Sequence, residues 1–262
     1  MAHTGVEGEV GKQTKIMPCI KPKVDCGEYR THLDTSCLPA LKIVYLYTDA
    51  ILITLYFLNG LGIIYKHNQV VAGEYDLDYF DGWERVKRVS HIVLHPSYDF
   101  FSHDSDVALI RMHGLVFFNE RIHPLPLPDL DMTRGCHRSL PHFSHSHRKD
   151  MYLIAGWGMT AEVSEMSHLV LQAYVPIISR EECWKAYPDL FTDTMICAGN
   201  ITHGGLDPCQ GDWGGALVTH DGFIKGVSSW SIGCGRPGFP GVYIDVTKVM
   251  DWICEISGAP FR

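Results

Sequence analysis

The chain has 262 residues, 46% hydrophobic and 20% charged, which suffices for one large or two small domains with a buried core. Its formal net charge of −8 argues against nucleic acid or an acidic membrane surface as the main partner. Nine cysteines are typical of an oxidising compartment, and the odd number leaves at least one thiol free or paired with another chain. The first residues show no apolar core of a secretory signal peptide, so cysteine content and chain start point to different compartments.

Residues 1–41 are polar and predict an irregular tail. They contain Cys19, Cys26 and Cys37 among prolines, lysines and threonines. The spacing of these cysteines matches no tight zinc pattern, so a metal cluster is the less favoured interpretation. Cys26 is a candidate to tether the tail to the following domain through Cys136.

The segment 42–65 contains the most apolar run of the chain and has two interpretations. Its length suits a transmembrane helix, which needs roughly 20 apolar residues, and the preceding lysines would keep the N-terminus cytoplasmic and the rest outside. Asp49 and Asn59 interrupt the run, however, and an aspartate at a helix centre costs roughly 2.5–3.5 kcal/mol on insertion. The alternative is a pair of buried strands rich in β-branched and aromatic residues. Contact with a membrane is expected only if this segment spans it.

Residues 66–258 form a domain of short alternating strands and turns. From Val70 onward it resembles the trypsin- and chymotrypsin-like serine proteases in the segments Val70–Leu77, His91–Tyr98, Asp104–Ile110, Ala155-Gly-Trp-Gly158, Cys209-Gln-Gly-Asp-Trp-Gly-Gly215 and Pro240-Gly-Val-Tyr243. The resemblance implies an all-β fold of two antiparallel barrels with a groove between them and a C-terminal α-helix. The pattern over Thr247–Ile256 is that of an amphipathic helix with Val249, Trp252 and Ile253 on one face.

The resemblance begins abruptly at Val70. The family's Ile-Val-Gly-Gly start and its Ala-Ala-His-Cys segment, with the catalytic histidine, belong in residues 1–69, and neither is present. We therefore expect a first barrel that is incomplete or aberrant, or that takes strands from the apolar run.

The nucleophile motif is altered at one position. Residues 211–215 read Gly-Asp-Trp-Gly-Gly, where the family has Gly-Asp-Ser-Gly-Gly. Trp213 thus occupies the nucleophile position, and an indole has no oxygen to attack a carbonyl and no usefully acidic proton. In the family, the aspartate that matches Asp212 pairs with an ammonium group. That pair shapes the oxyanion-binding backbone at the position of Gly211. Without that ammonium, we expect Asp212 to find another donor, take a proton or turn to solvent.

Asp106 matches the acid of the catalytic triad, which orients a histidine. That histidine is expected near residues 59–62, where nothing titrates, and His67 lies too close to the following strand. Asp106 is therefore expected to be a buried carboxylate that accepts hydrogen bonds, with Ser229 as the donor that the family's fold implies.

The resemblance also implies a specificity pocket for basic side chains. Asp207 matches its base, Ser229, Trp230 and Gly241 match its walls, and Ser231 stands where a rim glycine is usual. The expected partners are proteins or peptides with basic side chains. The alternative is an inherited pocket without a ligand, because a shared fold does not establish function.

The loop from Gly73 to Glu84 resembles the family's calcium loop without a gap. Calcium takes six to eight oxygen ligands, which a curved acidic loop supplies together with water. The alternative is a solvated acidic loop. The implied ligands are the carboxylates of Glu74, Asp81 and Glu84 and the backbone oxygens of Asp76 and Tyr79.

The resemblance implies disulfides Cys183–Cys197 and Cys209–Cys234, and it assigns no partner to Cys136 or Cys254. Asn200-Ile-Thr202 is an acceptor sequence for N-glycosylation in exported protein. An insertion at 136–150 contains four histidines that favour a solvated loop over a zinc site: His137, His142, His145 and His147.

These features predict a catalytically inactive homologue that serves as a binding or regulatory module, either extracellular or tethered to the outside of a membrane. Two alternatives stay open: an active serine-type endopeptidase of trypsin-like specificity, and a truncated or aberrant product without independent function.

Overall fold

The computed structural model describes residues 44–47, 50–53, 69–128 and 151–257. Several predictions therefore fall outside the described residues: the tail at 1–41, the position of the expected histidine at 59–62, His67, and the insertion with Cys136 and its four histidines.

The N-terminal half of the described chain is a five-stranded antiparallel sheet in the order β1-β2-β5-β4-β3. Part of the apolar run supplies two of these strands, and β2 pairs with β5 through Ile51 and Ile110. In β3, exposed and buried residues alternate, as expected of a strand with one face on a core. The strands are β1 (Val44–Tyr47), β2 (Ala50–Ile53), β3 (Gln69–Ala72), β4 (Arg85–Leu94) and β5 (Ala108–Met112).

Within the described residues, every helix is too short or too polar to cross a membrane.

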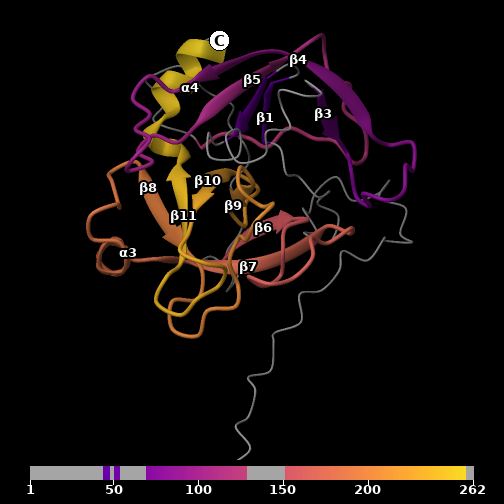
Figure 1. Cartoon of the computed structure of the whole chain (residues 1–262). Coiled ribbons are helices and arrows are strands. Elements are labelled where there is room, and N and C mark those ends of the chain that lie inside the picture. The colour runs from indigo at the N-terminus through magenta and orange to yellow at the C-terminus, as the bar shows by residue number, and fades with distance from the viewer. Residues whose placement is uncertain (1–43, 48–49, 54–68, 129–150, 258–262) are drawn as a thin grey trace, which may run out of the picture.

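The C-terminal half is a closed six-stranded barrel in the order β10-β11-β8-β7-β6-β9, which lies below the sheet in Figure 1. Because the barrel is closed, each strand has a hydrogen-bonded neighbour on both sides, and there are no exposed edge strands as in an open sheet. Val175, Ala198, Leu217 and Tyr243 are fully buried together inside it. Its strands are β6 (Met151–Gly156), β7 (Leu171–Ile178), β8 (Met195–Ala198), β9 (Ala216–Val218), β10 (Ile224–Trp230) and β11 (Gly241–Asp245).

Three helical segments complete the described fold: α3 (Arg180–Ala186), the 3₁₀ turn η3 (Val246–Lys248) and α4 (Met250–Ser257). The predicted C-terminal helix is confirmed, although its first turn is 3₁₀ and the α-helix begins at Met250. Val249, Trp252 and Ile253 are all buried, as the amphipathic pattern predicts. Trp252 makes an edge contact with the ring of His95, at 4.8 Å between centroids, so α4 is packed against the segment after β4.

The two halves share an apolar core. Val107 and Leu109, in and just before β5, belong to the same buried cluster as Leu153 of β6, Val227 of β10 and Ile253 of α4. The all-β fold predicted from the sequence, with its C-terminal helix, is therefore confirmed. The junction between the halves positions Asp106, which directly precedes Val107, against the strand β10.

Candidate functional site

The segment Cys209–Gly215 forms a tight turn before β9, held by backbone hydrogen bonds. The N–H of Asp212 donates to the carbonyl of Cys209 at 2.9 Å, and that of Gly215 donates to Asp212 at 3.0 Å. Ser228 fixes the turn from β10, because its hydroxyl donates to the Asp212 carbonyl at 2.7 Å and accepts from the Gly215 N–H at 3.0 Å. A Cβ at Gly215 would lie 2.9 Å from the Asp212 carbonyl oxygen, so this close approach requires glycine. Trp213 lies at the apex, half-buried.

The carboxylate of Asp212 accepts backbone donors, the first of the three outcomes expected from the sequence. Oδ1 accepts the N–H of Gly158 at 2.8 Å, and Oδ2 accepts that of Cys209 at 3.3 Å. A Cβ on Gly158 would lie only 2.1 Å from Oδ2, so the Ala155-Gly-Trp-Gly158 segment is shaped to receive this carboxylate. Hydrogen bonds of this kind stabilise the charged form of a buried carboxyl group.

Gly211 has a φ of +93°, a left-handed conformation that favours glycine. A Cβ there would lie 2.7 Å from Cε of Met166, so the Met166 side chain lies against this glycine. Met166 belongs to the loop between β6 and β7, which also forms a hydrogen bond between Met159 N–H and the Gln210 carbonyl at 2.9 Å. The loop thus covers the backbone that the resemblance assigns to oxyanion binding.

Asp106 is fully buried and accepts a short hydrogen bond from the hydroxyl of Ser229, itself fully buried. This is the contact that the family resemblance implies for the two residues. Ser229 lies at the end of β10, so the bond joins the barrel to the segment before β5.

Asp207 lies half-buried at the foot of the predicted pocket. Its Oδ2 accepts the Gly235 N–H at 3.3 Å, while Oδ1 is buried and has no hydrogen-bond partner among the described residues. A Cβ on Gly241 would lie 2.2 Å from that Oδ1, so the predicted wall glycine does adjoin the predicted base. Burial raises the pKa of Asp207 well above its usual value, and the charge of Asp212 adds to this. The N–H of Gly235, which donates to Oδ2, and the nearby N–H of Gly241, which does not reach hydrogen-bond geometry with Oδ1, oppose the rise.

The predicted wall residues Trp230 and Ser231 are each held by a contact with a neighbouring segment. Trp230 is 6% exposed and packs edge-on against Tyr187 at 4.8 Å between centroids, and Tyr187 donates to the Pro240 carbonyl at 2.7 Å. The hydroxyl of Ser231 donates to the Gly233 carbonyl at 2.6 Å, so it is engaged with its own loop. These contacts fix the segments on either side of Gly235.

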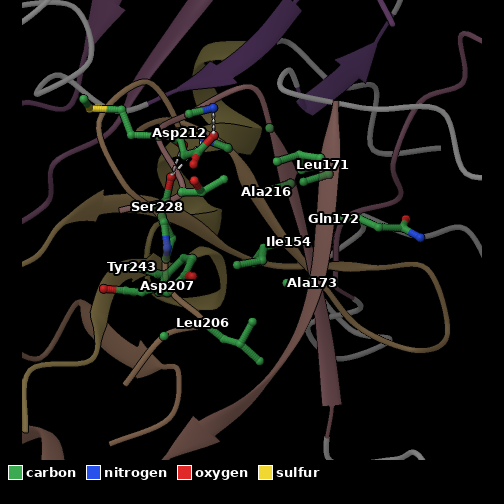
Figure 2. Close-up of a pocket in the computed structure, with 18 residues that line it drawn as sticks. Ile154, Leu171, Gln172, Ala173, Leu206, Asp207, Asp212, Ala216, Ser228 and Tyr243 are labelled. Carbon is green, nitrogen blue, oxygen red and sulfur yellow. Dashed lines mark hydrogen bonds between the residues drawn. The ribbon is translucent and has the colours of Figure 1, made fainter. Parts of the chain in front are cut away.

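A cavity of about 60 Å³ lies between β6, β7 and the segment 205–212, and Figure 2 shows Asp207 and Asp212 on its wall. Its other labelled lining residues are Ile154, Leu171, Gln172, Ala173, Leu206, Ala216, Ser228 and Tyr243. Of the five predicted pocket residues, only Asp207 lines it; Ser229, Trp230, Ser231 and Gly241 do not. This cavity is therefore not the pocket predicted from the sequence, although Asp207 borders it.

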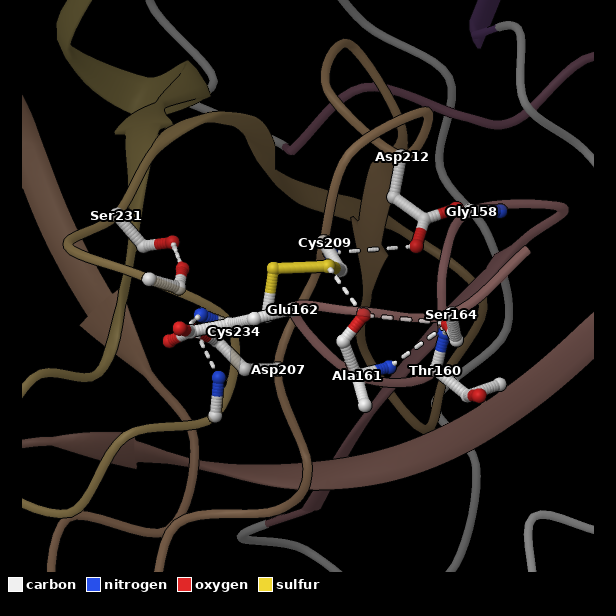
Figure 3. Close-up of a disulfide and its surroundings, with 12 residues drawn as sticks. Gly158, Thr160, Ala161, Glu162, Ser164, Asp207, Cys209, Asp212, Ser231 and Cys234 are labelled. Atoms are coloured by element: carbon white, nitrogen blue, oxygen red, sulfur yellow. Dashed lines mark hydrogen bonds between the residues drawn. A yellow bond between two sulfur atoms is a disulfide. The ribbon is translucent and has the colours of Figure 1, made fainter. Parts of the chain in front are cut away.

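Both predicted disulfides, Cys183–Cys197 and Cys209–Cys234, are confirmed, with Cα atoms 5.9 and 5.0 Å apart. Cys254, to which no partner was assigned, is also disulfide-bonded. Figure 3 shows Glu162 beside the Cys209–Cys234 bridge. Its carboxylate accepts the Cys234 N–H at 3.2 Å and pairs with the guanidinium of Arg236, so the loop between β6 and β7 is joined to the segment that holds Gly235.

The acidic loop 73–84 is closed by its own hydrogen bonds. Glu84 is 5% exposed, and its two carboxylate oxygens accept the N–H groups of Asp81 at 2.9 Å and Gly82 at 2.8 Å. Asp81 is ion-paired with Arg121. Burial raises the pKa of Glu74, the Tyr75 N–H opposes this, and the charges of Glu84 and Asp81 add to it. The negative charges of Asp81 and Glu84 therefore act on Glu74. In the part of the chain that the structure describes, however, no three Asp, Glu, His or Cys side chains converge as metal ligands.

Asn200, in the predicted glycosylation sequence, lies in the turn after β8. Its side-chain oxygen accepts the His203 N–H at 3.0 Å, and its carbonyl accepts the Gly204 N–H at 2.7 Å.

An antiparallel sheet and a closed antiparallel barrel that share a core, with a glycine-framed turn between β8 and β9, define a protein of the chymotrypsin fold class. Residues 63–253 match the family model described as Trypsin. Trypsin-1 of Astacus astacus is 37% identical over 189 residues, 71% of this chain and 73% of that relative. Anionic trypsin of Bos taurus is 37% identical over 194 residues, 74% and 72% of the two chains. Trypsin 5G1 of Aedes aegypti is 41% identical over 176 residues, 66% and 60%. The chain therefore belongs to the trypsin family of serine proteases.

Sequence reasoning missed three features of this site: Gly158 as the donor to Asp212, the pair Glu162–Arg236, and the pair Arg121–Asp81. Only the first had a visible signal, since Gly158 belongs to the motif Ala155-Gly-Trp-Gly158. The two ion pairs join residues from separate loops, and no local pattern indicates them.

Proposed function

We propose that this chain is a catalytically inactive member of the trypsin family that binds basic side chains of a protein or peptide without cleaving them. The observation that carries the proposal is Trp213, at the apex of a turn whose glycines and carboxylate are otherwise framed as a nucleophile turn. Covalent catalysis needs a hydroxyl or thiol activated by a base, and an indole supplies neither.

The surroundings of Trp213 support the same conclusion. Met166 lies against Gly211, where an oxyanion would have to meet backbone donors. This contact packs the turn without contributing to acyl transfer.

Asp207 supports retained binding. Its Oδ1 is buried without a hydrogen-bond partner among the described residues, and a buried polar group in that state costs about 1–3 kcal/mol. An ammonium or guanidinium group from a ligand would remove that cost and favour the charged carboxylate. A bidentate guanidinium–carboxylate pair is the strongest form of such a contact.

We also propose one structural calcium ion in the acidic loop, held by Glu74, Asp81, Glu84 and the backbone oxygens of Asp76 and Tyr79. Calcium prefers oxygen ligands, and this loop supplies them. Burial raises the pKa of Glu74, the charges of Glu84 and Asp81 add to this, and a bound cation would offset their repulsion. The ion would supply charge neutralisation to the loop. The disulfides further support an extracellular location, where such bonds persist.

The test separates binding from chemistry. A serine-reactive phosphonate should leave the purified chain unlabelled, and benzamidine, a mimic of the arginine side chain, should bind in calorimetry. Asp207→Asn is the control, because it preserves shape and removes the charge that recognises the ligand. Labelling would overturn the inactive assignment, and equal benzamidine binding by the wild type and the variant would overturn the pocket.

A further inference from the structure

One face of the N-terminal sheet carries basic side chains on β4 and β5. In β5, Ile110 and Met112 belong to a buried apolar cluster, whereas Arg111 between them is exposed. Because successive side chains of a strand point to opposite faces, Arg111 lies on the face turned away from that cluster. His91 of β4 is in register with Arg111 and is exposed too. This face therefore presents a guanidinium and an imidazole on neighbouring strands.

A bulge in β4 brings a second basic pair onto the same face. The register shifts between Val89 and His91, so β4 has one residue more than β5 over this stretch. Without the bulge, Arg88 and His91 would point to opposite faces, because they are three residues apart. Opposite Arg88 lies His113, whose N–H donates to the Arg88 carbonyl at 2.8 Å, and both side chains are exposed. We call this set the basic face: Arg88, His91, Arg111 and His113.

The basic face lacks carboxylates that would compensate its charge. Among the described residues, no carboxylate is ion-paired with Arg88, His91 or His113. Carboxylates are not scarce, since the chain has 30 Asp and Glu residues against 22 Lys and Arg. Like charges directly opposite one another destabilise a sheet, so an anion bound at this face would be favourable. Elsewhere in the described chain, carboxylates are ion-paired with Arg121, Arg180, Lys185, Lys225 and Arg236.

Two exposed valines adjoin the basic face. Val71 of β3 and Val86 of β4 are in register, and they are 39% and 51% exposed. Val86 lies two residues before Arg88, so both side chains are on the same face of β4. A sulfated polysaccharide would gain little from apolar contacts of this kind. The valines therefore favour a protein segment that has apolar as well as anionic side chains.

We propose that the basic face, together with Val71 and Val86, is a docking site for an extended acidic segment of a partner protein. Side chains two residues apart on a strand lie about 6.6–6.8 Å apart, and the same spacing separates alternate side chains of an extended partner segment. Carboxylates at alternate positions would accept bidentate hydrogen bonds from Arg88 and Arg111. An apolar side chain two positions before the first carboxylate would cover the valines. Docking here and binding at Asp207, in the C-terminal half, are independent proposals.

The experiment uses a synthetic peptide as the probe: acetylated and amidated Val-Ser-Glu-Ser-Glu-Ser, which places one valine and two glutamates on one side of an extended chain. It is titrated into the isotope-labelled full chain at physiological ionic strength, and NMR chemical shifts locate the site and give the dissociation constant. The double variant Arg88→Gln, Arg111→Gln should bind roughly tenfold more weakly, because each of two exposed ion pairs contributes about a factor of three. Replacing the valine of the peptide with serine should weaken binding by the wild type about threefold.

The matched control removes two positive charges elsewhere. Arg180 and Lys185 are exposed residues of α3, which lies in the C-terminal half (Figure 1). The double variant Arg180→Gln, Lys185→Gln should change the affinity by less than about twofold, because salt screens exposed charges beyond about 8 Å. If the double variant of the basic face does not fold, Arg88→Gln alone repeats the measurement, with a loss of about threefold expected.

Two outcomes would contradict the proposal in distinguishable ways. Equal peptide affinity in the wild type and the basic-face variants, or no shifts in β4 and β5, would overturn the docking site. Heparin that binds the same residues more tightly than the peptide would assign the face to a sulfated polysaccharide and overturn the protein partner. Neither result bears on benzamidine binding at Asp207.

Discussion

Asp212, in the turn, and Asp207, at the pocket base, lie five residues apart in sequence, but their carboxylates differ in hydrogen-bond partners. Asp212 accepts N–H groups from Gly158 and Cys209, one on each oxygen. Asp207 has one oxygen on Gly235 and a second, buried oxygen without a partner among the described residues. The protein satisfies the first group by itself, whereas the second still needs a proton or a cationic ligand. The proposed binding of basic side chains without cleavage rests on this difference.

The largest effect is expected from crowding the Asp212 site. Gly158→Ala would place a Cβ 2.1 Å from Oδ2, so the carboxylate must leave its donors, and unfolding free energy should fall by about 3–5 kcal/mol. Urea denaturation measures the change. Gly205→Ala is the control, because Gly205 has a φ of +86° and no atom within 4 Å of its Cβ position, so the backbone strain alone should cost about 1 kcal/mol. Equal losses in the two variants would show that the Asp212 site tolerates crowding.

A smaller loss is expected when the buried donor to Asp106 is removed. Ser229→Ala deletes a hydrogen bond to a fully buried carboxylate and should lower the free energy of unfolding by about 2–3 kcal/mol. Ser231→Ala removes a hydroxyl that donates to a carbonyl in its own loop, and it should cost no more than about 1 kcal/mol. Parity of the two serine variants would mean that the Ser229 contact contributes little to stability.

Removing the charge of Asp207 should raise the free energy of unfolding, whereas the two substitutions above should lower it. Its pKa is raised in the folded state, so the folded protein holds the proton more tightly than the unfolded chain. Below the unfolded pKa, near 3.9, both states are protonated and Asp207 costs nothing; stability is lost as the pH rises from there through the folded pKa. Asp207→Asn cannot ionise, so it should be more stable than the wild type by about 1–2 kcal/mol at pH 8 and indistinguishable at pH 3.5. A variant that is less stable at pH 8 would show that the charged carboxylate has a partner.

The smallest effect is expected from restoring the hydroxyl alone. Trp213→Ser adds a weak nucleophile without a base, and in serine–histidine pairs loss of one member lowers turnover by about 10⁶. Hydrolysis of an arginine ester by the variant should therefore equal the background rate. Hydrolysis well above background that disappears in the double variant with Asp207→Ala would reveal a base, with His67 the first candidate.

The sequence predicted the parts of this molecule that depend on short motifs. The two disulfides, the C-terminal helix and the Ser229–Asp106 contact all follow from segments matched to the family. The contacts that it did not predict join residues far apart: Gly158 and Asp212 are separated by 54 positions, Arg121 and Asp81 by 40, and Arg236 and Glu162 by 74. Such pairs depend on how loops meet after folding, and no periodicity or turn signal encodes them.

The apolar run was ambiguous for a related reason. A stretch of β-branched and aromatic residues has the same composition whether it becomes strands or a helix, so composition left both interpretations open. The strand β2 pairs with β5, more than 50 residues later in the chain, and β1 pairs with β2.

That pairing also covers the backbone of β5 on its second side. Because β2 covers one side of β5 and β4 the other, residues 108–111 have strand partners on both sides. Without residues 44–53, β5 would become an edge strand, and its apolar sequence Ala-Leu-Ile-Arg-Met would offer a template for another chain. Residues 44–53 therefore move this edge of the sheet from β5 to β1.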